Sequence, residues 1–268
     1  MFKNLSIGQY YPADSLIHRL DSRVKLVATL VYIVMLFVIN SVAGYALALV
    51  FISAVIALSK VPVKFMLRGL RAIFIIIIFT AVLNAFFTPG ATVLVKLGPA
   101  TVTAEGLITA AKMCTRLVFL IVGSSVLTFT TTPIQLTDAI EFLLKPLKKI
   151  GVPAHEIAMM MSIALRFIPT LMEEMDKIMK AQMARGADFD TGGLIKKAKS
   201  LVPLLVPLFI SSFRRAEDLA LAMEARCYRG DVGRTRMKEA KMRAVDYKAV
   251  VVMAAFCALC RLSVVFKI

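Results

Sequence analysis

The sequence has no tryptophan, two histidines and four cysteines, and charged residues make up only 19% of it. Soluble domains average about 25% charged residues and about 45–50% apolar residues, whereas hydrophobic residues make up 59% of this chain. Four scattered cysteines are too few for a disulfide framework. The scarcity of charge and the long apolar runs exclude a soluble globular enzyme and a disordered chain. They predict an integral membrane protein with several helices.

The motifs of common catalytic and metal sites are also missing. The sequence contains no G-x-x-x-x-G-K-[ST] phosphate loop, no H-E-x-x-H and no nucleophile elbow. His18 and His155 have no partners at ligand spacing. Cys257 and Cys260 form a C-x-x-C pair inside an apolar run, without the second pair of ligands that a metal site needs. We therefore predict no catalytic residue, no bound metal and no cofactor, and interpret these cysteines as small apolar residues of a membrane helix.

Acidic residues are few: 17 against 33 basic residues, which gives a net charge of +16. In a soluble protein this charge would favour nucleic-acid binding, but no RNA-binding signature is present. Basic loops held against an anionic cytoplasmic leaflet explain the charge better. We predict that the chain contacts the lipid bilayer and binds no nucleic acid.

Five apolar runs are long enough to suggest membrane helices. They cover 24–39, 42–58, 72–87, 107–129 and 247–266. The predicted fold is an all-α integral membrane protein, with about five transmembrane helices and a long cytoplasmic or interfacial section of amphipathic coupling helices. Its predicted parts are an N-terminal membrane domain of four helices (1–129), the cytoplasmic section (130–246) and a C-terminal transmembrane helix (247–268).

Basic residues set the predicted orientation, because loops rich in lysine and arginine stay in the cytoplasm. Four cations (Lys3, Arg19, Arg23 and Lys25) lie around the start of the first run, and four more (Lys60, Lys64, Arg68 and Arg71) separate the second run from the third. The turn at Asn40 carries no charge. We predict a multi-pass protein with its N-terminus in the cytoplasm and its C-terminus outside.

Amphipathic helices are predicted within 130–246, which holds all but three of the acidic residues. A short helix is predicted over 138–150. A long helix is predicted over 155–186, kinked by Pro169 and ended by Gly186. Apolar residues recur along it every three or four positions: Ile157, Met161, Ala164, Leu165, Ile168, Leu171, Met172, Met175, Met179 and Met183.

The run 201–213 is apolar but contains Pro203 and Pro207. As a helix it would reach about 20 Å, less than the roughly 30 Å hydrocarbon core. We interpret it as a half-buried or interfacial segment that leads into a separate helix over 214–227. A sixth transmembrane helix is the alternative, because proline is tolerated in membrane helices.

A near-repeat, AQMARGADF and AMEARCYRG, places Arg185 and Arg226 close to the ends of two predicted helices. An arginine between small residues can enter a groove and pair with a carboxylate through its planar fork. The alternative is that each cation only complements the dipole of its helix. The duplication favours two docking sites, formed by Ala184, Arg185 and Gly186 and by Ala225, Arg226 and Cys227.

Two further features have both a functional and a structural interpretation. Methionine lets a surface repack against different partners, so Met161, Met172, Met175 and Met179 are candidate contacts with a partner protein, or else ordinary packing residues. Lys112 and Arg116 lie inside a membrane run, where ionisable residues are functional candidates. They could instead extend towards the membrane surface.

Three stretches resemble the transmembrane T component of energy-coupling factor (ECF) transporters, a branch of the ABC transporters. GQYYPADSLIHRLDSRVKL resembles the family's D-S-x-x-H-R-L-D-x-R-x-K-L opening, with Ser22 where many relatives have proline. ALRFIPTLMEEMDKIMKAQMARG, which ends at Gly186, and AMEARCYRG are similar to its two coupling-helix segments. Cys227 stands where glycine is frequent, and Arg229 follows closely, so either Arg226 or Arg229 is the docking residue of the second segment.

The resemblance implies a protein of the prokaryotic cell membrane with three partners: two cytoplasmic ABC ATPases and a membrane S component that binds the substrate. The ATPases would bind ATP and Mg²⁺, and would hold the two arginine motifs in their grooves. The S component would bind a vitamin or a metal ion, so another chain would select the nutrient. The alternative function is a self-contained carrier or channel, which should show polar residues at the midplane of broken membrane helices. A membrane enzyme is a third and weaker alternative.

Overall fold

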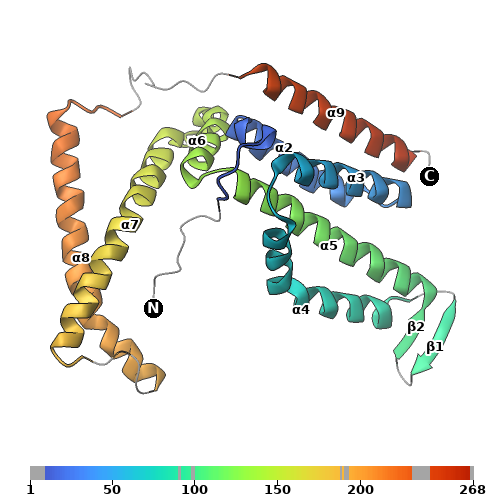
Figure 1. Ribbon diagram of the computed structural model, residues 1–268, viewed down its shortest axis with the longest axis horizontal. Helices are drawn as coiled ribbons and strands as arrows, with labels where there is room; N and C mark the ends of the chain where they lie inside the picture. Colours follow the sequence, from blue (N-terminus) through green and yellow to red (C-terminus); the bar gives the residue numbers. More distant parts are fainter. Residues whose placement is uncertain are drawn as a thin grey trace. The chain divides into compact units, whose positions relative to one another are not determined.

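The computed structural model describes residues 10–89, 92–97, 100–187, 189, 193–230 and 242–265 (Figure 1). This part of the chain is helical except for one β-hairpin, which confirms the predicted helical membrane fold. The α-helices are α1 (Leu16–Arg19), α2 (Ser22–Val38), α3 (Val42–Ser59), α4 (Val63–Phe87), α5 (Ala104–Thr130), α6 (Pro133–Leu144), α7 (Ala154–Ala184), α8 (Leu194–Ala225) and α9 (Ala244–Val265). A 3₁₀ helix, η1 (Lys145–Ile150), follows α6, and the strands β1 (Val93–Leu97) and β2 (Ala100–Thr103) pair antiparallel between α4 and α5.

The chain forms two compact units. We call the described part of 6–139 and 239–268 the membrane unit, because it contains every helix that is apolar and long enough to cross a bilayer. The described part of 140–238 is called the arm unit; it contains α7 and α8. Helix α6 begins in the membrane unit and ends in the arm unit.

Three described helices are long and apolar enough to span a membrane: α3, α5 and Ala244–Val264 of α9. Helix α4 becomes a fourth if its two parts, Val63–Arg71 and Ile73–Phe87, which meet at 60°, form one span. Helix α2 has 17 residues, fewer than the roughly 20 that usually cross a bilayer. The number of five spans therefore stays a prediction.

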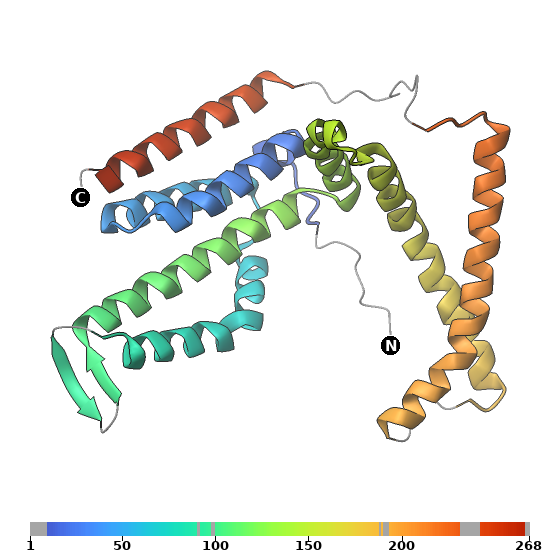
Figure 2. The same ribbon diagram turned by 180° about the vertical axis from the view of Figure 1, so that it is seen from behind.

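Aromatic and small residues build the core of the membrane unit, in which α2 and α3 lie between α9 and α5 (Figures 1 and 2). The rings of Phe51 and Phe256 stack 4.3 Å apart, and Tyr32 lies beside both. Gly123 of α5 lies so close to the Tyr32 ring that a Cβ there would clash with it. Cys260 is fully buried in this core, in keeping with its predicted apolar role.

The N-terminal motif that resembles the ECF opening holds three helices of the membrane unit together. The Lys25 ammonium donates to the backbone oxygens of Thr130, at 2.8 Å, and His18, at 3.2 Å. The buried Asp246 carboxylate accepts the Asp21 N–H at 2.8 Å and the Arg243 N–H at 2.7 Å. The motif thereby joins the start of α2 to the end of α5 and the start of α9.

Arg116 of α5 has a structural role at the end of α2. Its guanidinium donates to the Ile39 backbone oxygen at 3.0 Å and to the Asn40 side chain at 3.3 Å, and it lies over the Phe37 ring. A cation at a helix C-terminus complements the helix dipole. These contacts favour the structural interpretation of Arg116.

The arm unit differs from the prediction in two helices. Instead of one helix over 138–150, α6 ends at Leu144 and η1 continues to Ile150, where Gly151, with a φ of +89°, follows as the C-cap. Instead of an interfacial segment followed by a separate helix, α8 is one helix of 32 residues that contains Pro203 and Pro207. The separation predicted at 213/214 was wrong, because proline removes one hydrogen bond at a time and neighbouring turns can carry the helix through.

Candidate docking site at two helix ends

Helix α7 ends in a Schellman motif, in which a left-handed residue, usually glycine, follows the C-cap. Its last helical residue is Ala184, and Arg185 is the C-cap. The Gly186 N–H donates to the Met183 oxygen at 3.0 Å, and the Ala187 N–H donates to the Gln182 oxygen at 3.0 Å. Gly186 has a φ of +88°. The predicted end of this helix at Gly186 is confirmed, and the helix runs without a break through Pro169.

Helix α8 ends with the same set of hydrogen bonds. Its last helical residue is Ala225, and Arg226 is the C-cap. The Cys227 N–H donates to the Glu224 oxygen at 2.8 Å, and the Tyr228 N–H donates to the Met223 oxygen at 3.1 Å. Cys227 has a φ of +55°, although a side chain disfavours this conformation. The backbone thus repeats the first motif even where cysteine replaces glycine.

The two arginines have nearly the same backbone conformation. Arg185 has φ −87° and ψ 7°, and Arg226 has φ −92° and ψ 14°. Both side chains are exposed, and each follows an exposed alanine. Of the two candidates in the second segment, Arg226 and not Arg229 occupies the position equivalent to Arg185. Each end therefore presents one guanidinium beside little side-chain bulk, which lets the end approach a groove closely.

A polar cluster that the sequence did not reveal joins α7 to α8 where they cross (Figures 1 and 2). The Glu174 carboxylate accepts hydrogen bonds from the Arg215 guanidinium, at 2.8 Å, and from the Ser211 hydroxyl. All three side chains are partly buried. Because a charge-assisted pair is directional, the cluster fixes how the two helices cross.

The predicted methionine surface is only half-exposed. Met161, Met172, Met175 and Met179 all have intermediate exposure, and α7 packs against α8. The large exposed apolar surface of the arm unit lies on α8 instead. We call it the α8 stripe; its residues are each more than half exposed and are Val202, Leu205, Val206, Phe209, Ile210 and Phe213.

Spacing places the α8 stripe on one side of the helix, since its members recur every three or four residues. At 100° per residue, Ser211 and Arg215 lie on the opposite side, where they contact Glu174 of α7. This spacing is local to 201–213 and is readable in the sequence.

Among the described residues, no group of three or more histidine, cysteine, aspartate or glutamate side chains could hold a metal ion. His155 lies 3.2 Å from the Glu141 carboxylate, and both belong to the arm unit.

Comparison with known proteins identifies the family. A family model described as cobalt transport protein CbiQ matches residues 13–238. A protein from Clostridium kluyveri, named energy-coupling factor transporter transmembrane protein EcfT, is 61% identical over 97% of this chain and 94% of its own length. The chain belongs to the CbiQ/EcfT family. Proteins of the same name from Thermosediminibacter oceani and Bacillus subtilis are 59% and 46% identical, over 92% and 97% of this chain and 93% and 98% of their own lengths.

Family membership confirms the resemblance that the three sequence stretches indicated. The chain is an EcfT-type transmembrane component of an energy-coupling factor transporter, located in a bacterial membrane. Its relatives are named as transporter components and not as enzymes. The matched residues 13–238 include both arginine motifs and the whole arm unit that the structure describes.

Proposed function

We propose that this chain couples ATP hydrolysis by two cytoplasmic ATPases to uptake through a substrate-binding S component. The observation that carries the proposal is the duplicated helix end, with the same cap, the same hydrogen bonds and one exposed arginine each. Two equivalent ends suit two equivalent partner surfaces, as a pair of ATPases would offer.

The chemistry of each end supports an ATPase groove as the receptor. The guanidinium can form two parallel hydrogen bonds with a carboxylate, and the small residues around it allow close backbone approach. The duplicated geometry also weighs against a purely dipolar role, which needs neither the alanine nor the left-handed residue. In this proposal ATP and Mg²⁺ bind to the partner chains, and this chain supplies no cofactor site.

Force transmission follows from the crossing of α7 and α8. When the ATPases close on ATP, they move the two helix ends that carry Arg185 and Arg226, either towards each other or by rotation. The Glu174 cluster makes the two helices move together, so the movement reaches the apolar surface of the arm unit. There the α8 stripe, with the half-exposed methionines of α7, would hold the S component, which carries the vitamin or metal ion.

Single and double arginine variants test the docking role. Arg185→Ala and Arg226→Ala should each weaken copurification of the ATPases, because losing one member of a desolvated charge pair costs about 2–5 kcal/mol. The double variant should lose the ATPases altogether while still inserting into the membrane. Copurification and membrane insertion are measured on the same preparations.

Arg229→Ala is the matched control, since it removes the same charge three residues beyond the C-cap Arg226. Geometric equivalence predicts that it binds the ATPases almost normally. Normal assembly of the double variant would refute the docking role. A loss with Arg229→Ala as large as that with Arg226→Ala would refute the assignment of the second docking residue.

A further inference from the structure

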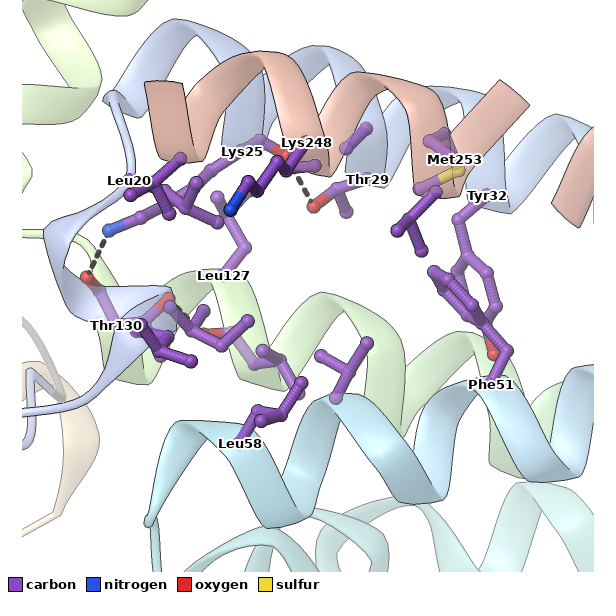
Figure 3. A pocket seen from close by; sticks show the side chains of 18 residues that line it. Leu20, Lys25, Thr29, Tyr32, Phe51, Leu58, Leu127, Thr130, Lys248 and Met253 are labelled. Carbon is purple, nitrogen blue, oxygen red and sulfur yellow. Dashed lines mark hydrogen bonds between the residues drawn. The ribbon is translucent and has the colours of Figure 1, made fainter. Parts of the chain in front are cut away.

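A cavity of about 390 Å³ lies in the membrane unit, lined by α1, α2, α3, α5 and α9 (Figure 3). This volume is in the range of small-molecule sites. Its walls come from one compact unit only, and none of the proposed docking residues contributes to them. Apolar side chains form most of the lining, among them Val55, Val126, Val252 and Met253.

The two ends of the cavity differ in character, as Figure 3 shows. At one end the Lys25 ammonium donates to the Thr130 backbone oxygen, and the Lys248 side chain extends from α9 on the same side of the cavity. At the other end are the rings of Tyr32 and Phe51, next to Met253. A ligand that fills the cavity therefore meets positive charge at one end and apolar side chains along the rest.

Lys248 provides the accessible charge of the pair. Lys25 is buried and donates to two backbone oxygens, whereas Lys248 is exposed and points into the cavity (Figure 3). Among the described residues, Lys248 has no hydrogen bond or ion pair. The nearby carboxylates of Asp21 and Asp246 lie outside the lining and accept backbone N–H groups.

We propose that this cavity binds an anionic phospholipid, with an acyl chain along the apolar walls and the phosphate at Lys248. A free anion would leave the apolar length of the cavity unfilled, and a zwitterionic lipid, although it has a phosphate, would bring its own cation close to the two lysines. The lysines lie at the starts of α2 and α9, where the predicted orientation places the cytoplasmic leaflet. Lysine near that surface attracts anionic lipid. The proposal is independent of ATPase docking.

Native mass spectrometry of the full chain in detergent tests the headgroup contact. Dioleoyl phosphatidylglycerol should bind more tightly than dioleoyl phosphatidylcholine. Lys248→Gln should lower the affinity for phosphatidylglycerol about fivefold, the effect of one lysine near the surface, and should lower the affinity for phosphatidylcholine much less. Lys64→Gln, which removes an exposed cation outside the cavity, is the matched control and should change neither.

Photocrosslinking of the unmodified chain tests the position of the acyl chain. Phosphatidylglycerol with a diazirine in its acyl chain should label α2 or α9 peptides that contain Tyr32 or Met253, and Lys248→Gln should reduce this labelling. The proposal is overturned if Lys248→Gln keeps the preference for phosphatidylglycerol, or if Lys64→Gln loses it equally. Labelling confined to residues outside the cavity would show annular lipid only and would also overturn it.

Discussion

At the scale of single residues, the left-handed positions of the two helix ends differ in one respect that can be measured. Gly186 has a φ of +88° with no atom within 4 Å of where its Cβ would be, so an alanine there would meet only backbone strain. Cys227 already bears that strain. We expect Gly186→Ala to cost about 1–2 kcal/mol at the end of α7, whereas Cys227→Ala should be nearly neutral.

Amide hydrogen exchange can measure this difference, because backbone strain at the left-handed residue weakens the hydrogen bonds of the last helical turn. In Gly186→Ala the Ala187 amide, which donates to Gln182, should exchange roughly five- to thirtyfold faster. In Cys227→Ala the equivalent Tyr228 amide should exchange as before. Equal acceleration at both ends would contradict the assigned backbone conformations.

The sequence predicts those features of the site that depend only on residues close together in the chain. The helix end at Gly186 and the equivalence of the two arginines depend on neighbours in the chain, and both were predicted. The contacts of Lys25 with Thr130 and of Glu174 with Arg215 join residues far apart in sequence. No periodicity or spacing encodes such pairs, so the Lys25–Thr130 contact and the polar cluster between α7 and α8 appear only in the structure.

At the scale of elements, the arm unit offers two candidate surfaces for the S component. The methionines of α7 are half-buried, whereas the α8 stripe is more than half exposed. Apolar area contributes to binding only if it is exposed before association. We therefore expect the α8 stripe to contribute more binding energy than Met161, Met172, Met175 and Met179.

Phe209→Glu places a charge in the middle of the α8 stripe and should release the S component while the ATPases remain bound, because an unpaired charge is costly in an apolar contact. Phe209→Leu keeps the surface apolar and should have a mild effect. Met172→Glu and Met172→Leu form the corresponding pair on α7. Copurification of each partner with each variant distinguishes the two surfaces. Release of the S component by Met172→Glu but not by Phe209→Glu would place the contact on α7 instead.

At the scale of the whole molecule, the question is how many times the chain crosses the bilayer. Helices α2 and α9 lie alongside each other within the membrane unit. Their starts meet where Asp246 accepts the Asp21 N–H at 2.8 Å. Beyond the far end of α2, the hydroxyl of Ser41 in the turn to α3 lies 3.3 Å from that of Ser263 in the last turn of α9. Since α9 is long and apolar enough to span, α2 should cross in the same direction despite its 17 residues.

This pairing yields five spans if α4 counts as one. It also determines which loops and helix ends lie on the same side of the membrane. The Ser41 turn and the end of α9 must lie on the same side of the membrane. The basic residues around α1 place the start of α2 in the cytoplasm, so the Ser41 turn lies outside. In a cysteine-free background, Ser41→Cys and Ser263→Cys should both react with a membrane-impermeant maleimide added to intact cells. Lys64→Cys and Arg185→Cys should react only after the cells are opened. Opposite accessibility of positions 41 and 263 would contradict the parallel arrangement of α2 and α9, and outward accessibility of position 185 would exclude docking to cytoplasmic ATPases.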